Sequence, residues 1–209
     1  GVKASGSYKF IIFLSPVNAY YPEPIKVKVD QQFARAVKGG VGYAKAAGNY
    51  GASLYPARLG QEEGYSQLIW TDAIEHRYIE ESGTMNIFFQ LGDTFVTPEI
   101  DGTILEGVTR DSVIKLLQEE GYKIEERPIS VDEVIEAHHN GTLNDAFGTG
   151  TAAVISHVKA IGYQGEELTL PAVEQRTASN RILKRLKQIQ KREVADPFQW
   201  VEEVEQIPV

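Results

Sequence analysis

Residues 67–91, QLIWTDAIEHRYIEESGTMNIFFQL, decide the fold class of this chain. Two apolar runs, QLIWTD at 67–72 and TMNIFFQL at 84–91, have the β-branched and aromatic content that is typical of strands. A polar stretch around Glu75 and His76 separates them and is typical of a turn. The segment therefore predicts an antiparallel hairpin, a connection that a purely parallel sheet does not contain.

Strands and helices alternate on both sides of this hairpin. Strands are predicted at 8–15, 25–29, 122–127 and 152–158. Helices are predicted at 30–37 behind a cap at Asp30, at 52–64, at 109–120, at 131–137 behind a cap at Ser130, and at 174–192. Alternation of this kind, with a hairpin mixed in, predicts an α+β (mixed α/β) domain.

Composition excludes several classes of function. The 209 residues carry 21 Lys and Arg against 29 Asp and Glu, so the net charge is −8 and neither nucleic acid nor an anionic membrane is an expected partner. The apolar run at 10–14 is too short for a membrane helix. The absence of cysteine excludes disulfides, thiolate zinc sites and cysteine nucleophiles, and it fits a reducing, cytoplasmic compartment. The adjacent His138 and His139 should point apart on a helix, so no metal site is expected.

Two segments carry groups suited to covalent or acid–base chemistry. Lys45 lies in KAAGNYG, between glycine-rich turns, where a buried and neutral amine could form a Schiff base. The other interpretation is a solvated lysine before a loop. In EESGTMN, at 80–86, a carboxylate could hold a cationic ring nitrogen and Thr84 could offer its hydroxyl, although a charged turn would have the same pattern.

Two further segments could bind anions. EGVTRDS at 106–112 predicts a helix start whose free N–H groups, near Val108 and Thr109, suit a phosphate, or simply an ordinary helix start. GTGTAA at 148–153 matches the dinucleotide pattern GxGxxA, but that pattern requires a helix to follow, and the residues that follow are strand-like. A glycine-rich turn between strands could still hold a phosphate or a carboxylate.

In their order along the chain, these segments resemble the branched-chain amino acid aminotransferases, which are pyridoxal-phosphate (PLP) enzymes of fold type IV. The matching motifs are SPVNAYY at 15–21, GGVGYAKAAGNYGASL at 39–54, EESGTMNIFF at 80–89, ILEGVTRDS at 104–112 and FGTGTAAV at 147–154. The resemblance is to the family's large C-terminal domain, a pseudo-barrel of sheets surrounded by helices. It implies that residues 1–209 form the PLP-binding large domain and that the small N-terminal domain is absent from this chain.

The resemblance gives each matching residue a role. Lys45 corresponds to the lysine that forms the Schiff base with PLP and then moves the substrate proton. Tyr50 corresponds to the tyrosine at the phenolic oxygen, and Glu81 to the partner of the pyridine nitrogen. The other implied contacts are Leu105 on the ring, Val108, Thr109 and Thr151 at the phosphate, Thr84 in the cofactor and substrate sites, and Tyr50, Thr151 and Ala152 at the substrate.

The activity implied by the resemblance is amino transfer between leucine, isoleucine or valine and 2-oxoglutarate, by a homodimer. The CxxC pair of mammalian members is replaced by Ala153 and Ser156, so a thiol switch of that kind is absent. Other fold-type IV enzymes, such as a D-amino acid aminotransferase or an aminodeoxychorismate lyase, are the nearest alternatives. A non-catalytic truncated domain is a third interpretation, since the small domain is missing.

Overall fold

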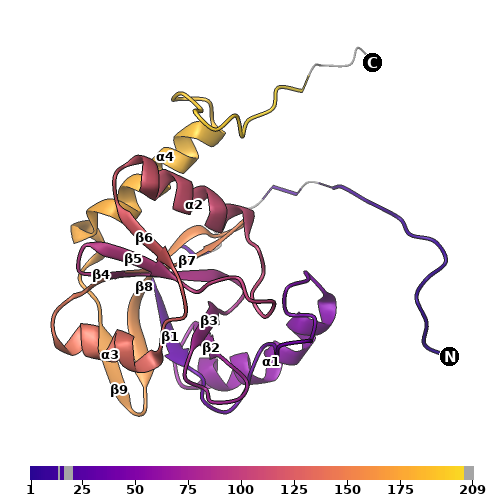
Figure 1. The fold of residues 1–209 in the computed structure, drawn as a ribbon, viewed down its shortest axis with the longest axis horizontal. Helices are drawn as coiled ribbons and strands as arrows, with labels where there is room; N and C mark the ends of the chain where they lie inside the picture. The colour runs from indigo at the N-terminus through magenta and orange to yellow at the C-terminus, as the bar shows by residue number, and fades with distance from the viewer. Residues whose placement is uncertain (14, 17–20, 205–209) are drawn as a thin grey trace.

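The structure, a computed structural model, describes residues 1–13, 15–16 and 21–204. Its strands form one mixed sheet in the order β3-β2-β1-β8-β7-β4-β5-β6, with β9 added to β8 (Figure 1). The strands are β1 Ile25–Val29, β2 Gln67–Thr71, β3 Ile79–Ser82, β4 Asn86–Leu91, β5 Thr94–Thr97, β6 Lys123–Glu126, β7 Leu143–Gly150, β8 Val154–Tyr163 and β9 Glu166–Thr169. The helices are α1 Ala47–Glu62, α2 Val108–Glu119, α3 Val131–His139 and α4 Thr177–Gln190, the last preceded by the 3₁₀ turn η1 Val173–Gln175.

Both parallel and antiparallel pairs occur in this sheet, which confirms the α+β prediction. Strand β1 is parallel to both β2 and β8, and β5 is parallel to β6, whereas the other neighbours are antiparallel. The ten-residue strand β8 joins the two halves of the sheet. Its first residues, from Val154 to His157, pair with β7, and its later residues, from Val158 to Gly162, pair with β1.

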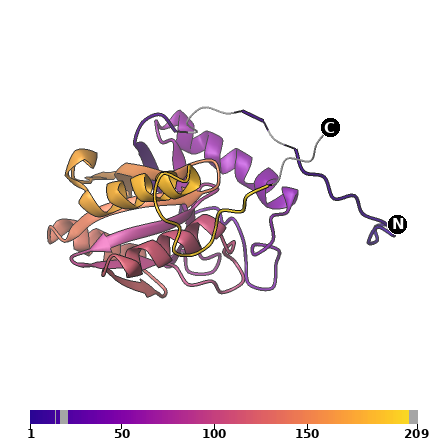
Figure 2. The same cartoon turned by 90° about the horizontal axis from the view of Figure 1, so that it is seen from above.

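Two apolar cores lie on opposite faces of the central strands. In β4, Ile87 and Phe89 enter one core, while Phe88 between them enters the other and stacks on Phe147 of β7. Helices α2 and α4 cover the Phe88 core side by side, as Figures 1 and 2 show. Because β4 is buried on both faces, its sequence is a continuous apolar run and does not alternate.

The predicted hairpin between 67–72 and 84–91 is wrong in its pairing. Strand β2 pairs with β3, and β4 pairs with β5 and β7. The sequence of β3, IEES, has three polar side chains and does not stand out as a strand, yet all four residues are buried. Its charges are stabilised by tertiary partners that a local pattern does not contain.

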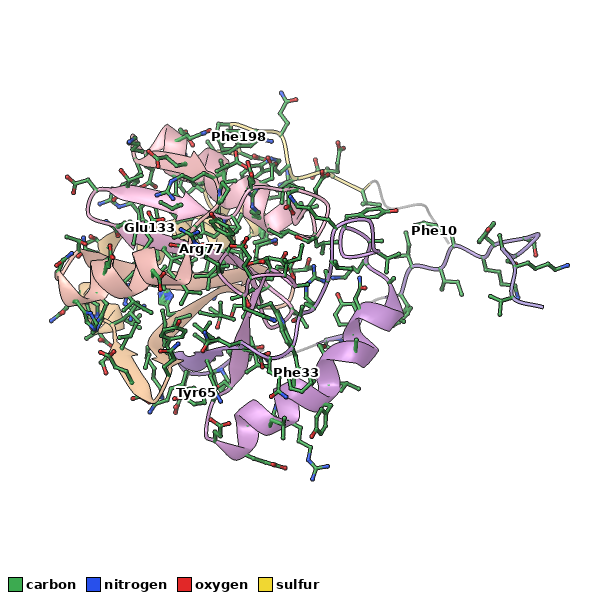
Figure 3. All side chains as sticks on the ribbon, turned by 60° about the horizontal axis from the view of Figure 1, so that its bottom comes forward. Phe10, Phe33, Tyr65, Arg77, Glu133 and Phe198 are labelled. Atoms are coloured by element: carbon green, nitrogen blue, oxygen red, sulfur yellow. The ribbon has the colours of Figure 1, made fainter. Side chains whose placement is uncertain are left out.

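The strand predicted at 8–15 is also wrong over its described residues, because 8–13 and 15 have no regular secondary structure. Phe10 and Phe13 are 90% and 83% exposed, and Figure 3 shows Phe10 projecting away from the body of the molecule. A strand requires a hydrogen-bonded neighbour, and none lies beside this segment within the described part of the chain. Residues 17–20 of the SPVNAYY motif lie outside the described residues.

Two of the helix predictions, those at 30–37 and at 52–64, need correction. The carboxylate of Asp30 accepts hydrogen bonds from the backbone of Gln32 and Phe33, but the turn does not continue into the helix expected at 30–37. Helix α1 begins at Ala47 and not at residue 52, so it includes Gly48 and Gly51. In this first turn Asn49 donates to the carbonyl oxygens of Val41 and Ala44, and these bonds counter the weak helix propensity of glycine.

The other predicted elements have their expected type. Ser130 caps α3 by accepting a hydrogen bond from the backbone N–H of Glu133 at 3.1 Å. Strand β8 follows the GTGTAA segment, so the helix that a dinucleotide fingerprint requires is not there. Over the described residues, no helix is both long and apolar enough to cross a bilayer.

Candidate active site

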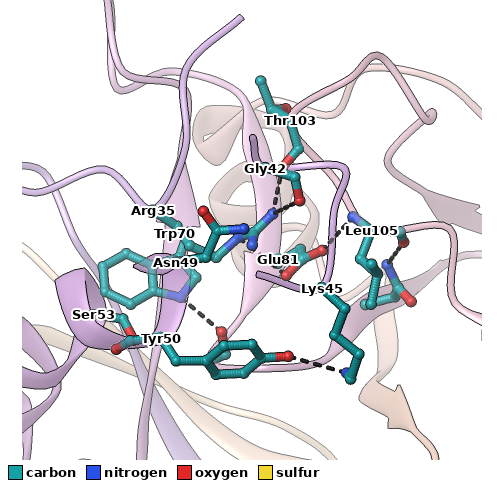
Figure 4. Close-up of polar contacts among 12 residues, drawn as sticks. Arg35, Gly42, Lys45, Asn49, Tyr50, Ser53, Trp70, Glu81, Thr103 and Leu105 are labelled. Atoms are coloured by element: carbon teal, nitrogen blue, oxygen red, sulfur yellow. Dashed lines mark hydrogen bonds and ion pairs between the residues drawn. The ribbon is translucent and has the colours of Figure 1, made fainter. Parts of the chain in front are cut away.

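A pocket beside the first turn of α1 brings together five of the predicted site residues, and Figure 4 shows four of them, Lys45, Tyr50, Glu81 and Leu105. Lys45 comes from the loop before α1, Tyr50 from the first turn of α1, Glu81 from β3, Thr84 from the turn after β3, and Leu105 from the loop before α2. The pocket is also lined by Arg35, Ala44, Asn49, Ser53 and Gly83. Segments that are far apart in the chain therefore converge, as the resemblance implies.

The Lys45 amine and the Tyr50 phenol form a hydrogen-bonded pair in this pocket. Lys45 Nζ lies 3.0 Å from Tyr50 Oη and 5.7 Å from the centre of the tyrosine ring. Lys45 is exposed, so the expectation of a buried amine is wrong. The reason is that the pocket opens to solvent on the Lys45 side, while Glu81 closes it at the bottom.

Asn49 fixes the loop that carries Lys45. Its side-chain amide donates to the carbonyl oxygens of Val41 and Ala44, each at 2.9 Å, and Asn49 is only 9% exposed. Because Asn49 belongs to α1, these bonds tie the loop before the helix to the helix itself. The orientation of Lys45 therefore depends on a neighbouring residue that the sequence analysis did not single out.

Glu81 is the buried acid of the pocket. Its Oε1 accepts the backbone N–H of Leu105 at 2.8 Å, and its Oε2 lies 3.1 Å from Arg35 Nε. Burial raises the pKa of Glu81 to about 7, against the opposing effects of the Arg35 charge, the Leu105 N–H and Lys45, while Glu80 adds to the rise. The carboxyl group can therefore gain or lose a proton near neutral pH.

The loop from 103 to 107 is held between Glu81 and β4. Leu105 donates its N–H to Glu81, and its carbonyl oxygen accepts from the side chain of Asn86 at 2.9 Å. Asn86 also lies so close to Gly107 that a Cβ at Gly107 would overlap with Asn86 Oδ1. Gly107 is therefore needed for close packing of the helix start, a role that the sequence alone did not reveal.

The residues predicted to bind the phosphate at the start of α2 lie next to the pocket and are not among its lining residues. Val108 and Thr109 open helix α2, directly after Gly107, and Val108 is 79% exposed. The first N–H groups of a helix have no partner within the helix and favour anions. The start of α2 therefore presents N–H groups without partners inside the helix, beside the Leu105 wall of the pocket.

Thr151 and Ala152 also lie outside the pocket lining, in the exposed turn between β7 and β8. Their position relative to α2 follows from the sheet register, since Asn86 pairs with Thr149, two residues before the turn. Asn86 thus borders the start of α2 on one side and the end of β7 on the other. The two predicted anion sites therefore lie close to the same place in the sheet, where β4 begins and β7 ends.

The structure also corrects the expectation that the neighbouring histidines point apart. His138 Nε2 contacts the Thr169 carbonyl at 3.0 Å, and His139 Nε2 contacts a Glu166 carboxylate oxygen at 2.9 Å. One ligand atom from each of His138, His139 and Glu166 lies within 4.8 Å of the others. This cluster lies where α3 meets β9, away from the pocket at the start of α1 (Figure 1).

Comparison with known proteins agrees with the fold and the order of the motifs. Residues 1–161 match the family model for amino-transferase class IV. Branched-chain-amino-acid aminotransferase 2 of Bacillus subtilis is 50% identical over 207 residues, which cover 98% of this chain and 57% of that protein. The chain therefore spans little more than half the length of this relative.

Solved structures are similar as well. The branched-chain amino acid aminotransferase of Escherichia coli has a TM-score of 0.72 at 28% identity, over 88% of this chain and 58% of that one. The branched-chain aminotransferase of the thermophilic archaeon Thermoproteus uzoniensis, solved with norvaline, has a TM-score of 0.71 at 26% identity, over 83% and 54% of the two chains. A further branched-chain amino acid aminotransferase, complexed with N-(5'-phosphopyridoxyl)-L-glutamate, has a TM-score of 0.63 at 25% identity, over 79% and 51% of the two chains. With a family match over more than three quarters of its length, this chain belongs to the class IV aminotransferases.

Proposed function

We infer that this chain is the PLP-binding part of a branched-chain amino acid aminotransferase. The observation that carries the proposal is the placing of an amine, a phenol and a buried carboxylate, Lys45, Tyr50 and Glu81, around one pocket. The relatives named above, one of which is complexed with a phosphopyridoxyl compound, support the choice of cofactor and of substrate class.

The side chains of the pocket fit the chemistry of PLP. The aldehyde carbon and the phenolic oxygen of PLP are on neighbouring ring positions, and Lys45 Nζ and Tyr50 Oη are neighbours at 3.0 Å. The ring nitrogen is opposite the aldehyde, and Glu81 closes the pocket away from its open, Lys45 side. When bound, PLP supplies an aldehyde and an electron-withdrawing ring that stabilises negative charge at the substrate α-carbon.

Each of these residues would then have a defined task. Lys45 would hold the aldehyde carbon covalently and, once the substrate amine has replaced it, carry the α-proton on Nζ. Tyr50 would hydrogen-bond the phenolic oxygen, and Glu81 would keep the ring nitrogen protonated as its carboxylate partner. Leu105 would pack against the ring face.

The anion sites beside the start of β4 and the end of β7 would hold the phosphate of the cofactor and the carboxylate of the substrate. The N–H groups of Val108 and Thr109, and the Thr151 hydroxyl, would bind the phosphate. The N–H groups of Thr151 and Ala152 would bind the substrate carboxylate. Thr84 and Tyr50 would complete the cofactor and substrate contacts.

The proposal extends to the rest of the enzyme. Residues 1–209 would be the large domain, and a small N-terminal domain and a second subunit would complete the pocket on its open side. The substrates would be leucine, isoleucine or valine and 2-oxoglutarate, and the enzyme would work in the cytoplasm.

The direct test is covalent capture of the cofactor. Purified protein is incubated with PLP and reduced with borohydride, and the mass of the peptide that contains residue 45 is measured. The wild type should gain one phosphopyridoxyl group on Lys45 and lose its visible absorbance band. Lys45→Ala should lack the visible band and show no adduct on any other lysine, whereas the control Lys187→Ala, at an exposed position of α4, should behave like the wild type.

An amino-donor screen tests the substrate class in the full-length enzyme that contains this chain. Leucine, isoleucine and valine should each convert 2-oxoglutarate to glutamate. Turnover with D-alanine alone would assign the chain to the D-amino acid aminotransferases. If Lys45→Ala keeps the visible band and carries a borohydride-stable phosphopyridoxyl group on another lysine, the catalytic assignment itself is wrong.

A further inference from the structure

Arg35 lies in the loop between β1 and α1, outside every segment that the sequence analysis singled out as reactive. Its side chain is only 9% exposed, and it lines the same pocket as Lys45 and Glu81. A long cationic side chain is rarely buried to this degree unless partners compensate its charge. The partners of Arg35 therefore indicate what it does.

The guanidinium group of Arg35 connects three parts of the pocket (Figure 4). Its Nε lies 3.1 Å from Glu81 Oε2, in an ion pair whose angle is not that of an aligned hydrogen bond. Its Nη2 donates to the carbonyl oxygens of Gly42, at 3.1 Å, and of Thr103. Arg35 thus links the loop before Lys45, the strand of Glu81 and the loop before Leu105.

Close packing around Gly42 fixes the backbone that holds the Arg35 guanidinium. Gly42 packs so tightly on the Thr103 carbonyl and on Ala36 that a Cβ at residue 42 would overlap with both. The two carbonyl oxygens that hold Nη2 are consequently fixed, and they hold the guanidinium group beside the Glu81 carboxylate. Arg35 therefore differs from a surface arginine, whose mobile side chain can change its position relative to a neighbouring carboxylate.

Glu81 needs such a partner because its other surroundings do not favour the charge strongly. The side chain of Glu81 is only 4% exposed, and burial raises its pKa to about 7 even with Arg35 in place. The neighbouring Glu80 on β3 disfavours the charge further, while the Leu105 N–H and Lys45 favour it. Arg35 makes the largest of the favourable contributions.

We propose that Arg35 is a positioning residue that favours the ionised form of Glu81 and holds its carboxylate at the ring-nitrogen end of the cofactor pocket. This inference rests on the proposed function for the identity of the ring, but its effect on Glu81 is independent of any cofactor. Without Arg35, Glu81 should be protonated at neutral pH, and a carboxylic acid cannot stabilise a protonated ring nitrogen as its anionic form does.

The first experiment uses protein without cofactor. The infrared C=O absorption of a protonated carboxylic acid is measured near pH 8, where a pKa of about 7 leaves the wild-type Glu81 mostly ionised, in Arg35→Met and in the double variant Arg35→Met/Glu81→Gln. The single variant should gain one such band relative to the wild type, and the double variant should lack it. Arg35→Lys, which keeps a positive charge, should not gain the band.

The second experiment measures the pH profile of leucine amino transfer in the PLP-loaded, full-length enzyme that contains this chain. In Arg35→Met the rate near pH 7.5 should fall by about 100-fold, and each pH unit above that should restore up to about tenfold as Glu81 ionises. A purely structural role would lower the rate by one factor at every pH. The control Arg58→Met, at a 76% exposed position of α1, should keep the wild-type profile.

The two experiments separate the two proposals. If the wild type forms no Lys45 adduct but the infrared band follows Arg35 as expected, the proposed function fails and the Arg35–Glu81 relation stands. If the adduct forms and Arg35→Met has neither the band nor a changed pH profile, the role of Arg35 is overturned. Should Arg35→Met not fold, a band in Arg35→Lys would overturn it instead, since that variant keeps the charge.

Discussion

The raised pKa of Glu81 makes the free energy of unfolding depend on pH, and substitution of this one residue can test that dependence. The folded protein holds a proton on Glu81 between pH 4.5 and about 7, where the unfolded chain is already ionised. The folded state then binds more protons than the unfolded state, so stability falls as pH rises through this window. The change from 4.5 to about 7 corresponds to about 3 kcal/mol.

Glu81→Gln should remove this pH dependence because glutamine does not titrate. In cofactor-free protein, the free energy of unfolding of Glu81→Gln relative to the wild type should rise by up to about 3 kcal/mol between pH 4.5 and 7, and stay level above it. Urea unfolding at a series of pH values measures the difference. Glu174→Gln, at an exposed position of η1, serves as control, and a constant difference across the window would contradict the pKa.

At the residue scale, sequence reasoning identified site residues that belong to a local motif. It missed residues whose role depends on contacts with distant parts of the chain. Lys45 and Tyr50 are five residues apart, so one segment contains both and their pairing follows from a single helix start. Arg35 is separated from Thr103 by 68 positions. No local pattern distinguishes it from the other arginines, and only the folded chain shows that its charge is buried.

At the scale of the elements, the loop before α1 depends on one glycine. A Cβ at Gly42 would overlap with Ala36 and with the Thr103 carbonyl, which also accepts from Arg35. Gly42→Ala should therefore push the two loops apart and lower the free energy of unfolding by about 1–3 kcal/mol, as overpacking does in closed interiors. The shift should appear in urea unfolding of the cofactor-free protein.

Gly48 provides a matched control for this prediction. It lies at the start of α1, and a Cβ there meets no heavy atom within 4 Å in the described structure. Gly48→Ala should leave stability unchanged or raise it by up to about 1 kcal/mol, because alanine favours the helix. Equal losses in the two variants would show that the close packing at Gly42 is not what holds the loop.

The elements that sequence reasoning placed wrongly share one physical cause. The run at 8–13 has the side chains of a strand, and Asp30 makes the first bonds of a helix cap. In each case local chemistry permits an element that only further hydrogen-bonded neighbours could extend. Strand β3 is the converse, since its charged sequence is unlike a buried strand and its partners come from Arg35 and the loop at 103–105.

At the scale of the whole molecule, one buried ion pair connects the centre of the sheet to the helix that covers it. Arg176, just before α4, lies 3.0 Å from Asp145 of β7, and both side chains are 1% exposed. Arg176 also donates to the Pro171 carbonyl, which fixes the chain between β9 and α4. Nearby, burial lowers the pKa of His157, so this histidine adds little charge to the pair.

Because the pair is buried, removing one partner should be far worse than removing both. Arg176→Met leaves the Asp145 carboxylate in the interior without a counter-charge and should lower the free energy of unfolding by about 3–5 kcal/mol. Arg176→Met/Asp145→Asn removes both charges and should recover most of this loss. Urea unfolding, monitored by circular dichroism, gives the free energies of unfolding of the wild type, the single variant and the double variant. Arg58→Met serves as an exposed control. If the single and double variants lose the same amount, the arginine contributes through its apolar stem and its bonds to Pro171, and the ion pair is not what fastens α4 to the sheet.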